Sequence, residues 1–311
     1  MKTFTLMPGD FASLFQTETS DFPNQCKSII AERDFRYSKM NQDERDKLIA
    51  DILKRIDSNE LAVSGSHRRL DWEHGWAENL AEFERTGDIY VLTPKFIKPG
   101  QPIRLNRDYV VPSSESFEFD VVDVLRRWLF TKYLGDSNTI YEFGCGSCQH
   151  IVVLAEMFPG NKVVGLDWAS SSIAIINRLT ETYGWNLEGK SFNLFEPDRT
   201  LRLEQGSAVF TVGTMEQLGC NFEPFLQYLL SNPISLCLHL ETIKELYDDR
   251  YLTDYLAMKF DGKRCYLNGF LPRLKELENE GIIQILRAQH ILFGNLYHDS
   301  YSLIVWKVNA L

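Results

Sequence analysis

The sequence Thr139-Ile-Tyr-Glu-Phe-Gly-Cys-Gly-Ser-Cys148 decides the fold of this chain. Residues 139–143 form a short apolar run typical of a buried strand, and Gly144 and Gly146 then predict a tight turn. The next segment, Gln149-His-Ile-Val-Val-Leu-Ala-Glu-Met-Phe158, has the apolar content of a helix. A strand, a glycine turn and a helix form the first half of a nucleotide-binding βα unit, where glycine permits positive φ and close approach of a ligand.

The charge beside this turn indicates which ligand it suits. The free N–H groups of a helix N-terminus attract a diphosphate, but Glu142, two residues before the first glycine, would repel one. Gln149 also stands where G-x-G-x-x-G requires its third glycine. Both features favour a cationic ligand. An acidic residue followed by G-x-G resembles the first motif of the class I S-adenosylmethionine (SAM)-dependent methyltransferases, in which this turn lies against the methionine part of the cofactor.

The remainder of the chain alternates strands and helices, as a doubly wound sheet requires. We expect helices at 117–134, 170–183 and 222–230, and strands at 162–167, 190–194, 207–212 and 234–240. A helical segment at 241–280, broken near 261–262, precedes strands at 282–293 and 301–308, which must be antiparallel because a short turn joins them. The predicted fold is therefore α/β and Rossmann-like, with a mostly parallel seven-stranded sheet ending in an antiparallel hairpin, similar to the architecture of that family.

The region before residue 116 carries weaker signals. Helices are expected at 41–56 and 71–83, and the proline-containing segment 93–112 is typical of an extended linker. We predict a helical cap over residues 1–115 that helps to select the acceptor, and a methyltransferase domain over residues 116–311. The resemblance to the family covers only 117–311.

The cofactor that the resemblance implies is SAM. Asp167 ends the second strand, 21 residues after Gly146, where an acidic side chain can accept both ribose hydroxyls, although it can also cap the next helix. The resemblance places Trp168 along the adenine, and Asn193 where the family often has an aspartate for the adenine amino group. It also places Gly213 in the segment that closes over the cofactor. The expected cofactor-binding residues are Glu142, Gly144, Gly146, Asp167, Trp168, Asn193, Leu194, Gly213 and Thr214.

Four residues are candidates for catalysis. His239 and Glu241 share one face of the fifth strand near its carboxyl end, as a general base and its orienter would, or as a buried core histidine and a helix cap. Glu216 follows the fourth strand and either faces the acceptor or caps a helix. His298 lies in the final turn and either reaches the acceptor or is solvated. The spacing does not require a metal, although His239, Glu241 and Glu216 would be its ligands if they converged.

Several other segments have two interpretations each. Trp72 and Trp76, together with Arg104, Arg107 and Tyr109, are expected in a lid over the acceptor, although the two tryptophans are equally suited to the core of the N-terminal region. Lys263 and Arg264 are expected either to bind an anionic acceptor or to cap a helix.

Composition restricts the classes of partner. The 311 residues are 44% hydrophobic and 24% charged, as in an ordinary globular protein, with a net charge of −10. The longest basic cluster is His67-Arg68-Arg69, which disfavours nucleic acid. No apolar run approaches the ~20 residues of a membrane span and no signal peptide is visible, while six scattered cysteines indicate a reducing, cytoplasmic location. A homodimer is one possible oligomeric state.

These features predict a SAM-dependent methyltransferase that acts on a small polar acceptor. A hydroxyl of a sugar or of a sugar-bearing secondary metabolite is the preferred acceptor, because a candidate base is present. The alternatives are N-methylation of a small amine, a non-catalytic SAM-binding scaffold, and an NAD-linked oxidoreductase.

Overall fold

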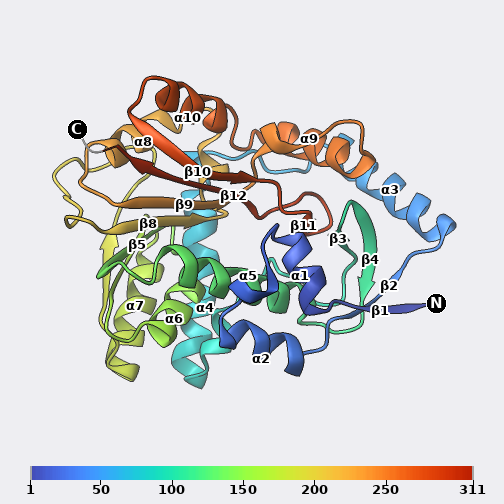
Figure 1. Ribbon diagram of the computed structural model, residues 1–311, viewed down its shortest axis with the longest axis horizontal. Coiled ribbons are helices and arrows are strands. Elements are labelled where there is room, and N and C mark those ends of the chain that lie inside the picture. Colours follow the sequence, from blue (N-terminus) through green and yellow to red (C-terminus); the bar gives the residue numbers. More distant parts are fainter. Residues whose placement is uncertain (1, 310–311) are drawn as a thin grey trace.

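Two β-sheets organise the computed structural model, which describes residues 2–309. In the larger sheet, β5 to β9 are parallel, β12 is antiparallel to β9, and β10 is antiparallel to β12. The predicted parallel sheet with an antiparallel C-terminal hairpin is confirmed (Figure 1). Its strands are, in spatial order, β10 (Ile283–Gln289), β12 (Ser302–Val308), β9 (Leu236–Glu241), β8 (Ala208–Val212), β5 (Thr139–Phe143), β6 (Lys162–Asp167) and β7 (Leu187–Ser191).

The strand β5 lies in the interior of this sheet, between β8 and β6. All five of its residues are buried, with Ile140 in one apolar core and Tyr141 and Phe143 in the other. The chain continues from β5 to β6 on one side, whereas β8 pairs with β5 on the other side. Strand order therefore reverses at β5, and ligands of doubly wound sheets bind beyond the carboxyl ends of the strands at such a point.

Helices cover both faces of the sheet (Figure 1). On one face lie α5 (Phe117–Tyr133), α6 (Gln149–Met157) and α7 (Ser170–Tyr183), and on the other α8 (Glu223–Leu230) and α10 (Phe270–Asn279). The remaining helix of this half, α9 (Leu252–Arg264), packs with the N-terminal α3 (Gln42–Asp57) in a separate apolar cluster. No helix within residues 2–309 is both long and apolar enough to cross a bilayer.

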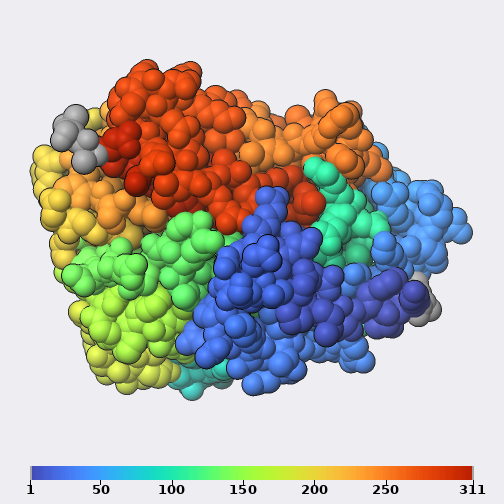
Figure 2. All heavy atoms as spheres, in the orientation of Figure 1, coloured from blue at the N-terminus to red at the C-terminus, as the bar shows by residue number. Residues whose placement is uncertain are grey.

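The N-terminal region is mixed rather than purely helical, which corrects the predicted helical cap. A five-stranded antiparallel sheet accompanies its helices, and its last strand, β11 (Phe293–Gly294), comes from the C-terminal half. Figure 2 shows these N-terminal residues, in blue, packed directly against the rest of the chain. The other elements are β1 (Thr3–Thr5), α1 (Pro8–Leu14), α2 (Asn24–Glu32), β2 (Arg36–Lys39), α4 (Arg69–Thr86), β3 (Ile103–Leu105) and β4 (Asp108–Pro112).

Two local predictions were wrong for identifiable reasons. The expected linker contains the hairpin β3–β4, whose two turn residues, Asn106 and Arg107, have φ values of 51° and 63°. Both central residues of a type I′ turn take positive φ, and this one lacks the glycine that would have signalled it. The expected break near 261–262 lies a few residues later, because α9 continues to Arg264 and ends at Cys265 in the left-handed conformation, and residues 265–269 separate it from α10.

Candidate functional site

The glycine turn after β5 is fixed to the end of β6. Gly144 and Gly146 have φ values of +72° and +52°. The Gly144 N–H donates to Leu166 O at 2.6 Å, and the Gly146 N–H donates to Asp167 Oδ2 at 2.8 Å. The other Asp167 oxygen, Oδ1, accepts from the Ala169 N–H at 2.8 Å. Burial raises the pKa of Asp167 to about 6, although these N–H donors act in the opposite direction.

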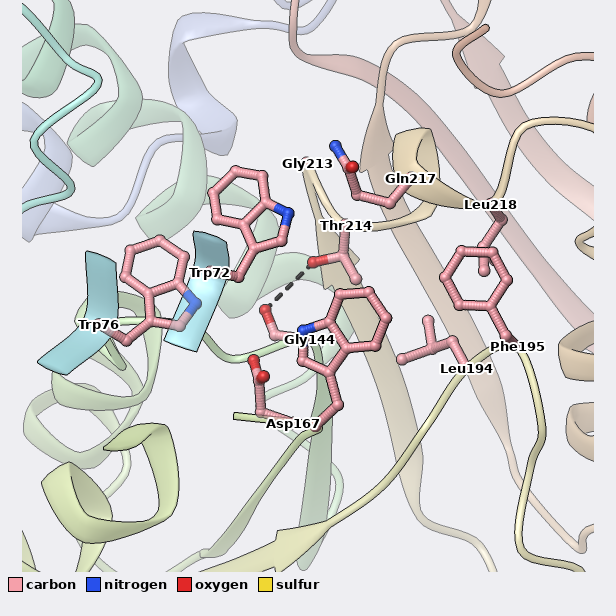
Figure 3. A pocket seen from close by; sticks show the side chains of 11 residues that line it. Trp72, Trp76, Gly144, Asp167, Leu194, Phe195, Gly213, Thr214, Gln217 and Leu218 are labelled. Carbon is pink, nitrogen blue, oxygen red and sulfur yellow. Dashed lines mark hydrogen bonds between the residues drawn. The ribbon is translucent and has the colours of Figure 1, made fainter. Parts of the chain in front are cut away.

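A pocket with about 500 Å³ of empty space opens beside this turn. Figure 3 shows Trp72 and Trp76 on one side of it, and Phe195 with Leu194 and Leu218 on the other. The Trp168 ring also lines the pocket and stacks on Phe195 with ring centroids 5.7 Å apart. Aromatic faces above a strand-end carboxylate suit a nucleoside, because the rings contact the flat base while the carboxylate accepts from ribose hydroxyls.

The N-terminal helix α4 supplies part of this pocket. Its Trp72 and Trp76 rings stack 5.5 Å apart, and a Cβ at Gly146 would approach the Trp76 ring to 2.9 Å. Glu73, on the same helix, accepts from the Ser170 N–H at 2.6 Å and from the Ser171 N–H at 3.0 Å. A carboxylate from α4 thus caps the N-terminus of α7, which holds the two tryptophans over the glycine turn.

A second, larger cavity with about 1900 Å³ of empty space adjoins the first. The two cavities share Trp72, Trp76, Gly144, Gly213 and Thr214. Glu142 lines the larger one and is only 1% exposed, yet its Oε2 atom has no hydrogen-bond partner in the described structure. Burial, followed by the Asp167 charge, raises the pKa of Glu142 well above its ordinary value. A buried, unpartnered carboxyl at a cavity wall fits a cationic ligand.

The segment after β8 lies across the boundary between the cavities. Gly213 has φ +58° and lines both, and a Cβ there would meet no protein atom within 4 Å. The Thr214 hydroxyl donates to Gly144 O at 3.1 Å, which fixes this segment against the glycine turn (Figure 3). A glycine with open space in front of it permits close approach of a ligand to the backbone.

Glu241 has a capping geometry. Its two carboxylate oxygens accept from the Thr214 and Met215 N–H groups, each at 3.1 Å, at the start of the 3₁₀ turn Met215–Leu218. Burial raises the pKa of Glu241 to about 8. Among the described residues that line either cavity, Glu241 is not present. Of its two sequence interpretations, the cap is the one that this geometry supports.

His239 also lies away from the cavities. Its ring is 0% exposed, its Nε2 accepts from Trp306 Nε1 at 3.0 Å, and its Nδ1 lies 2.9 Å from Thr211 Oγ1. Since the indole can only donate, Nε2 carries no proton and the Nδ1–H donates to Thr211. Burial lowers the pKa of His239 to about 3. Both nitrogens are occupied within the core, so this histidine has no atom left for a substrate.

His298 lines the larger cavity and has the geometry of an oriented base. Its Nδ1 lies 2.9 Å from Asp261 Oδ1 and 3.1 Å from Thr242 Oγ1, whereas no described residue hydrogen-bonds its Nε2. Burial acts to lower the pKa of His298, but the Asp261 charge and hydrogen bond outweigh it, and the pKa is raised. An Nδ1–H that donates to a carboxylate leaves the Nε2 lone pair free to accept a proton.

The turn that carries His298 is built by its neighbours. Asn295 Oδ1 accepts from the Tyr297 N–H at 2.8 Å and from the His298 N–H at 3.3 Å, and Asn295 Nδ2 donates to Ser300 Oγ at 2.9 Å. Gly294 fits beneath this turn because it lacks a side chain: a Cβ there would lie 2.2 Å from His298 O. Of the two interpretations of this turn, the solvated one does not fit, because the turn is an ordered part of the cavity wall.

Two more acids share this wall. Glu216 lines the cavity, accepts from Gln217 Nε2 at 3.2 Å, and has a pKa raised by burial. Burial raises the pKa of Glu118 to about 7, and its Oε1 accepts from the Tyr301 hydroxyl at 3.3 Å. The structure thus brings Glu216 and His298 to one cavity, together with Glu118, which the sequence reasoning did not single out.

The position of Asn193 supports a contact with the cofactor less directly than that of its neighbour Leu194. Its Oδ1 accepts from the Phe195 N–H at 3.1 Å in a local turn, whereas Leu194 lines the nucleoside pocket. Because β7 ends at Ser191, three residues before the predicted end of this strand, Asn193 lies in the loop beyond the sheet. Asp261 was also missed as a functional residue, since Asp-Gly in a polar helix is more typical of a break.

Among the described residues, His239, Glu241 and Glu216 do not form a group of ligand atoms close enough to hold a metal ion. In the described part of the chain, the ligand atoms of Asp254, His290 and Asp299 do lie within 4.8 Å of one another. Arg104 Nε approaches Asp299 at 3.5 Å, and Arg107 Nη2 approaches Asp254 at 3.5 Å. Two guanidinium groups already neutralise this cluster, so it has the charge balance of an ion-pair network.

The order and directions of the strands in the larger sheet define a Rossmann-like α/β fold. No protein-family model matches the chain, and no curated protein matches it in sequence. Solved structures that it resembles include magnesium protoporphyrin IX methyltransferase from Synechocystis PCC 6803 with bound SAM (14% identity, 76% of this chain and 97% of that one, TM-score 0.45). Another is an rRNA methylase from Escherichia coli (10% identity, 97% of this chain and 99% of that one, TM-score 0.45). A third is geranyl diphosphate C-methyltransferase from Streptomyces coelicolor A3(2) (12% identity, 64% of this chain and 86% of that one, TM-score 0.43).

Proposed function

We propose that this chain transfers a methyl group from SAM to a hydroxyl of a small molecule. One observation carries the proposal: the pocket with Asp167 and the aromatic pair adjoins a cavity that contains both the unpartnered Glu142 carboxyl and the free Nε2 of His298. A nucleoside site, a site for a cation and a base thus follow one another across a shared boundary.

The residues present fit SAM at specific points. Asp167 would hold the ribose and Trp168 with Phe195 the adenine, while Glu142 would neutralise the methionine ammonium, relieving its own buried, unpartnered state. Gly144, Gly146 and Gly213 would provide backbone without side chains where the ligand approaches. When bound, SAM supplies a methyl group on a sulfonium, whose C–S electron pair stays with sulfur on transfer.

The chain's own contribution to the reaction is alignment and proton removal. His298 Nε2 would take the proton of the acceptor hydroxyl as the oxygen forms its bond to the methyl carbon, and Asp261 would stabilise the resulting imidazolium. Glu241 and Thr214 would act only by holding the segment that separates cofactor and acceptor. A base with its orienting carboxylate favours a hydroxyl over an amine acceptor, since an amine needs only its lone pair.

Calorimetry with SAM and with S-adenosylhomocysteine tests the cofactor. We expect micromolar binding that is weakened at least tenfold in Asp167→Ala, a loss of about 1.4 kcal/mol or more. Asp198→Ala, an exposed aspartate in the loop after β7, is the matched control and should bind as the wild type does.

Two results would redirect the proposal. Heat from NADH in place of SAM would make the chain a dinucleotide-binding oxidoreductase. SAM binding without methyl transfer to any sugar, metabolite or amine would leave a cofactor-binding scaffold.

A further inference from the structure

The wall of the larger cavity contains an arginine without an anionic partner. Arg264 ends α9 and lines the cavity, and no carboxylate in the described structure lies within salt-bridge distance of it. Its Nε atom is buried and has no hydrogen-bond partner there. Other arginines of the same lining are paired: Arg55 with Glu60, and Arg68 with Asp71 at 3.0 Å.

Two aromatic rings hold Arg264 in position. Its guanidinium carbon lies 4.8 Å from the Tyr266 ring centroid and 5.7 Å from that of Phe260. Rings stabilise a cation through their electron-rich faces without neutralising it. The C-terminus of α9 does the same through its dipole, so the positive charge is tolerated while it stays available to a ligand.

The same two rings also contact the proposed base. The His298 ring lies 5.3 Å from Phe260 and 5.7 Å from Tyr266, measured between centroids. Arg264 and His298 therefore pack against the same two rings, and both line the larger cavity.

The charges of the cavity favour an anion despite the acidic chain. The net charge of −10 would repel one at long range. Inside the cavity, however, the pKa values of the lining carboxyls Glu118, Glu142 and Glu216 are all raised by burial, which reduces their negative charge. Lys98 lines the same cavity and, among the residues described, has no acidic partner within salt-bridge distance.

We propose that Arg264 binds a phosphate or carboxylate group of the acceptor, on the same molecule whose hydroxyl faces His298. This inference rests on the proposed methyl transfer and specifies its substrate class: a hydroxylated, anionic small molecule, such as a sugar phosphate or a sugar acid. The guanidinium would donate charge-assisted hydrogen bonds to two oxygens of the anion, which fixes the direction in which the acceptor enters.

Inorganic phosphate and acetate serve as separate probes of this site. The full chain is titrated with each anion at constant ionic strength while the thermal unfolding midpoint is followed. We expect saturable stabilisation in the wild type and in Arg250→Gln, an exposed arginine paired with Asp248. The apparent dissociation constant should rise at least about tenfold in Arg264→Gln and by less in Arg264→Lys, which keeps the charge.

The outcomes separate the two anions and the two proposals. Tighter saturation by phosphate indicates a phosphorylated acceptor, and tighter saturation by acetate a carboxylate-bearing one. An equal response of wild type and Arg264→Gln, or no saturable response, overturns the role of Arg264. Calorimetry with SAM on the same samples should give dissociation constants within twofold of each other. Loss of SAM binding in all of them would instead refute the methyltransferase proposal.

Discussion

A buried histidine has opposite pKa shifts in two regions of the molecule, the core around β9 and the cavity wall around the final turn. His239 and His298 are 0% and 5% exposed. The neutral partners of His239, Thr211 and Trp306, allow burial to lower its pKa to about 3. The charged partner of His298, Asp261, raises its pKa above the ordinary value instead. Burial alone therefore does not identify a functional histidine; the charge of its partner and the freedom of its second nitrogen do.

The largest expected effect is on the reaction. His298→Gln should lower kcat by about 10²–10⁴, the usual contribution of a general base, because a glutamine side chain cannot take the acceptor proton. The rate of methyl transfer from labelled SAM measures it, and calorimetry should show SAM affinity unchanged within twofold. His74→Gln, whose side chain is 83% exposed, is the matched control. Full activity in His298→Gln would remove the distinction between the two histidines.

The next effect is on stability. His239→Ala should lower the free energy of unfolding by about 2–5 kcal/mol, because it leaves a cavity in the core and deprives the Trp306 indole of its acceptor. Urea denaturation measures the loss, and activity per folded molecule should persist. A variant that unfolds no more easily but loses methyl transfer would return His239 to the active site.

The two histidines should also give opposite dependences of stability on pH. Because the folded pKa of His239 is below 6.5, the unfolded state binds more protons, and stability falls with decreasing pH from 6.5 to about 3. The slope is up to about 1.4 kcal/mol per pH unit and should be missing in His239→Gln. Because the folded pKa of His298 is raised, its contribution is present below pH 6.5 and is lost as pH rises through the folded pKa. Urea denaturation at a series of pH values measures the contribution of each histidine to the dependence of stability on pH. Contributions of the same sign from both histidines would show that the assignment is wrong.

Asp261→Asn should shift the pH profile of the reaction. A base must be neutral, so the raised pKa of His298 places the acid limb of kcat above pH 6.5. Removing the carboxylate charge lowers that pKa, and the limb should move to lower pH by about one unit, the equivalent of a 1.4 kcal/mol interaction. An unshifted limb in the variant would show that another group controls the profile.

The smallest effect concerns protons released on binding. The raised pKa of Glu142 leaves part of the unliganded protein protonated there, and an ammonium bound nearby would restore the carboxylate. SAM binding should then release a fraction of a proton, seen as a calorimetric heat that depends on the ionisation enthalpy of the buffer. Glu142→Gln should lack this dependence while the control Asp198→Ala retains it. Identical heats in all buffers for the wild type would argue against Glu142 as the cationic subsite.

The cofactor half of the candidate site could largely be predicted because its residues follow consecutive strands. Asp167 ends β6 where the pattern placed it, and β5, Gly144 and Gly146 form the expected strand and turn. Strand ends of a parallel sheet meet at one edge, so local sequence is enough to bring them together. The placements that failed depend on local turns, as at Asn193, where the strand ended earlier than its apolar pattern suggested.

By itself, the sequence determined the class of fold, the seven-stranded sheet with its antiparallel end, and the glycine turn with its acidic neighbours. Only the tertiary structure decided which residues meet at the larger cavity. It brought His298, from the last turn, to Asp261 on α9, and it placed tryptophans of α4 over the glycine turn. It also buried His239 among neutral partners. The physical reason is range: hydrophobic periodicity and turn chemistry act over a few residues, whereas a partner 37 positions away is fixed by packing of the whole chain.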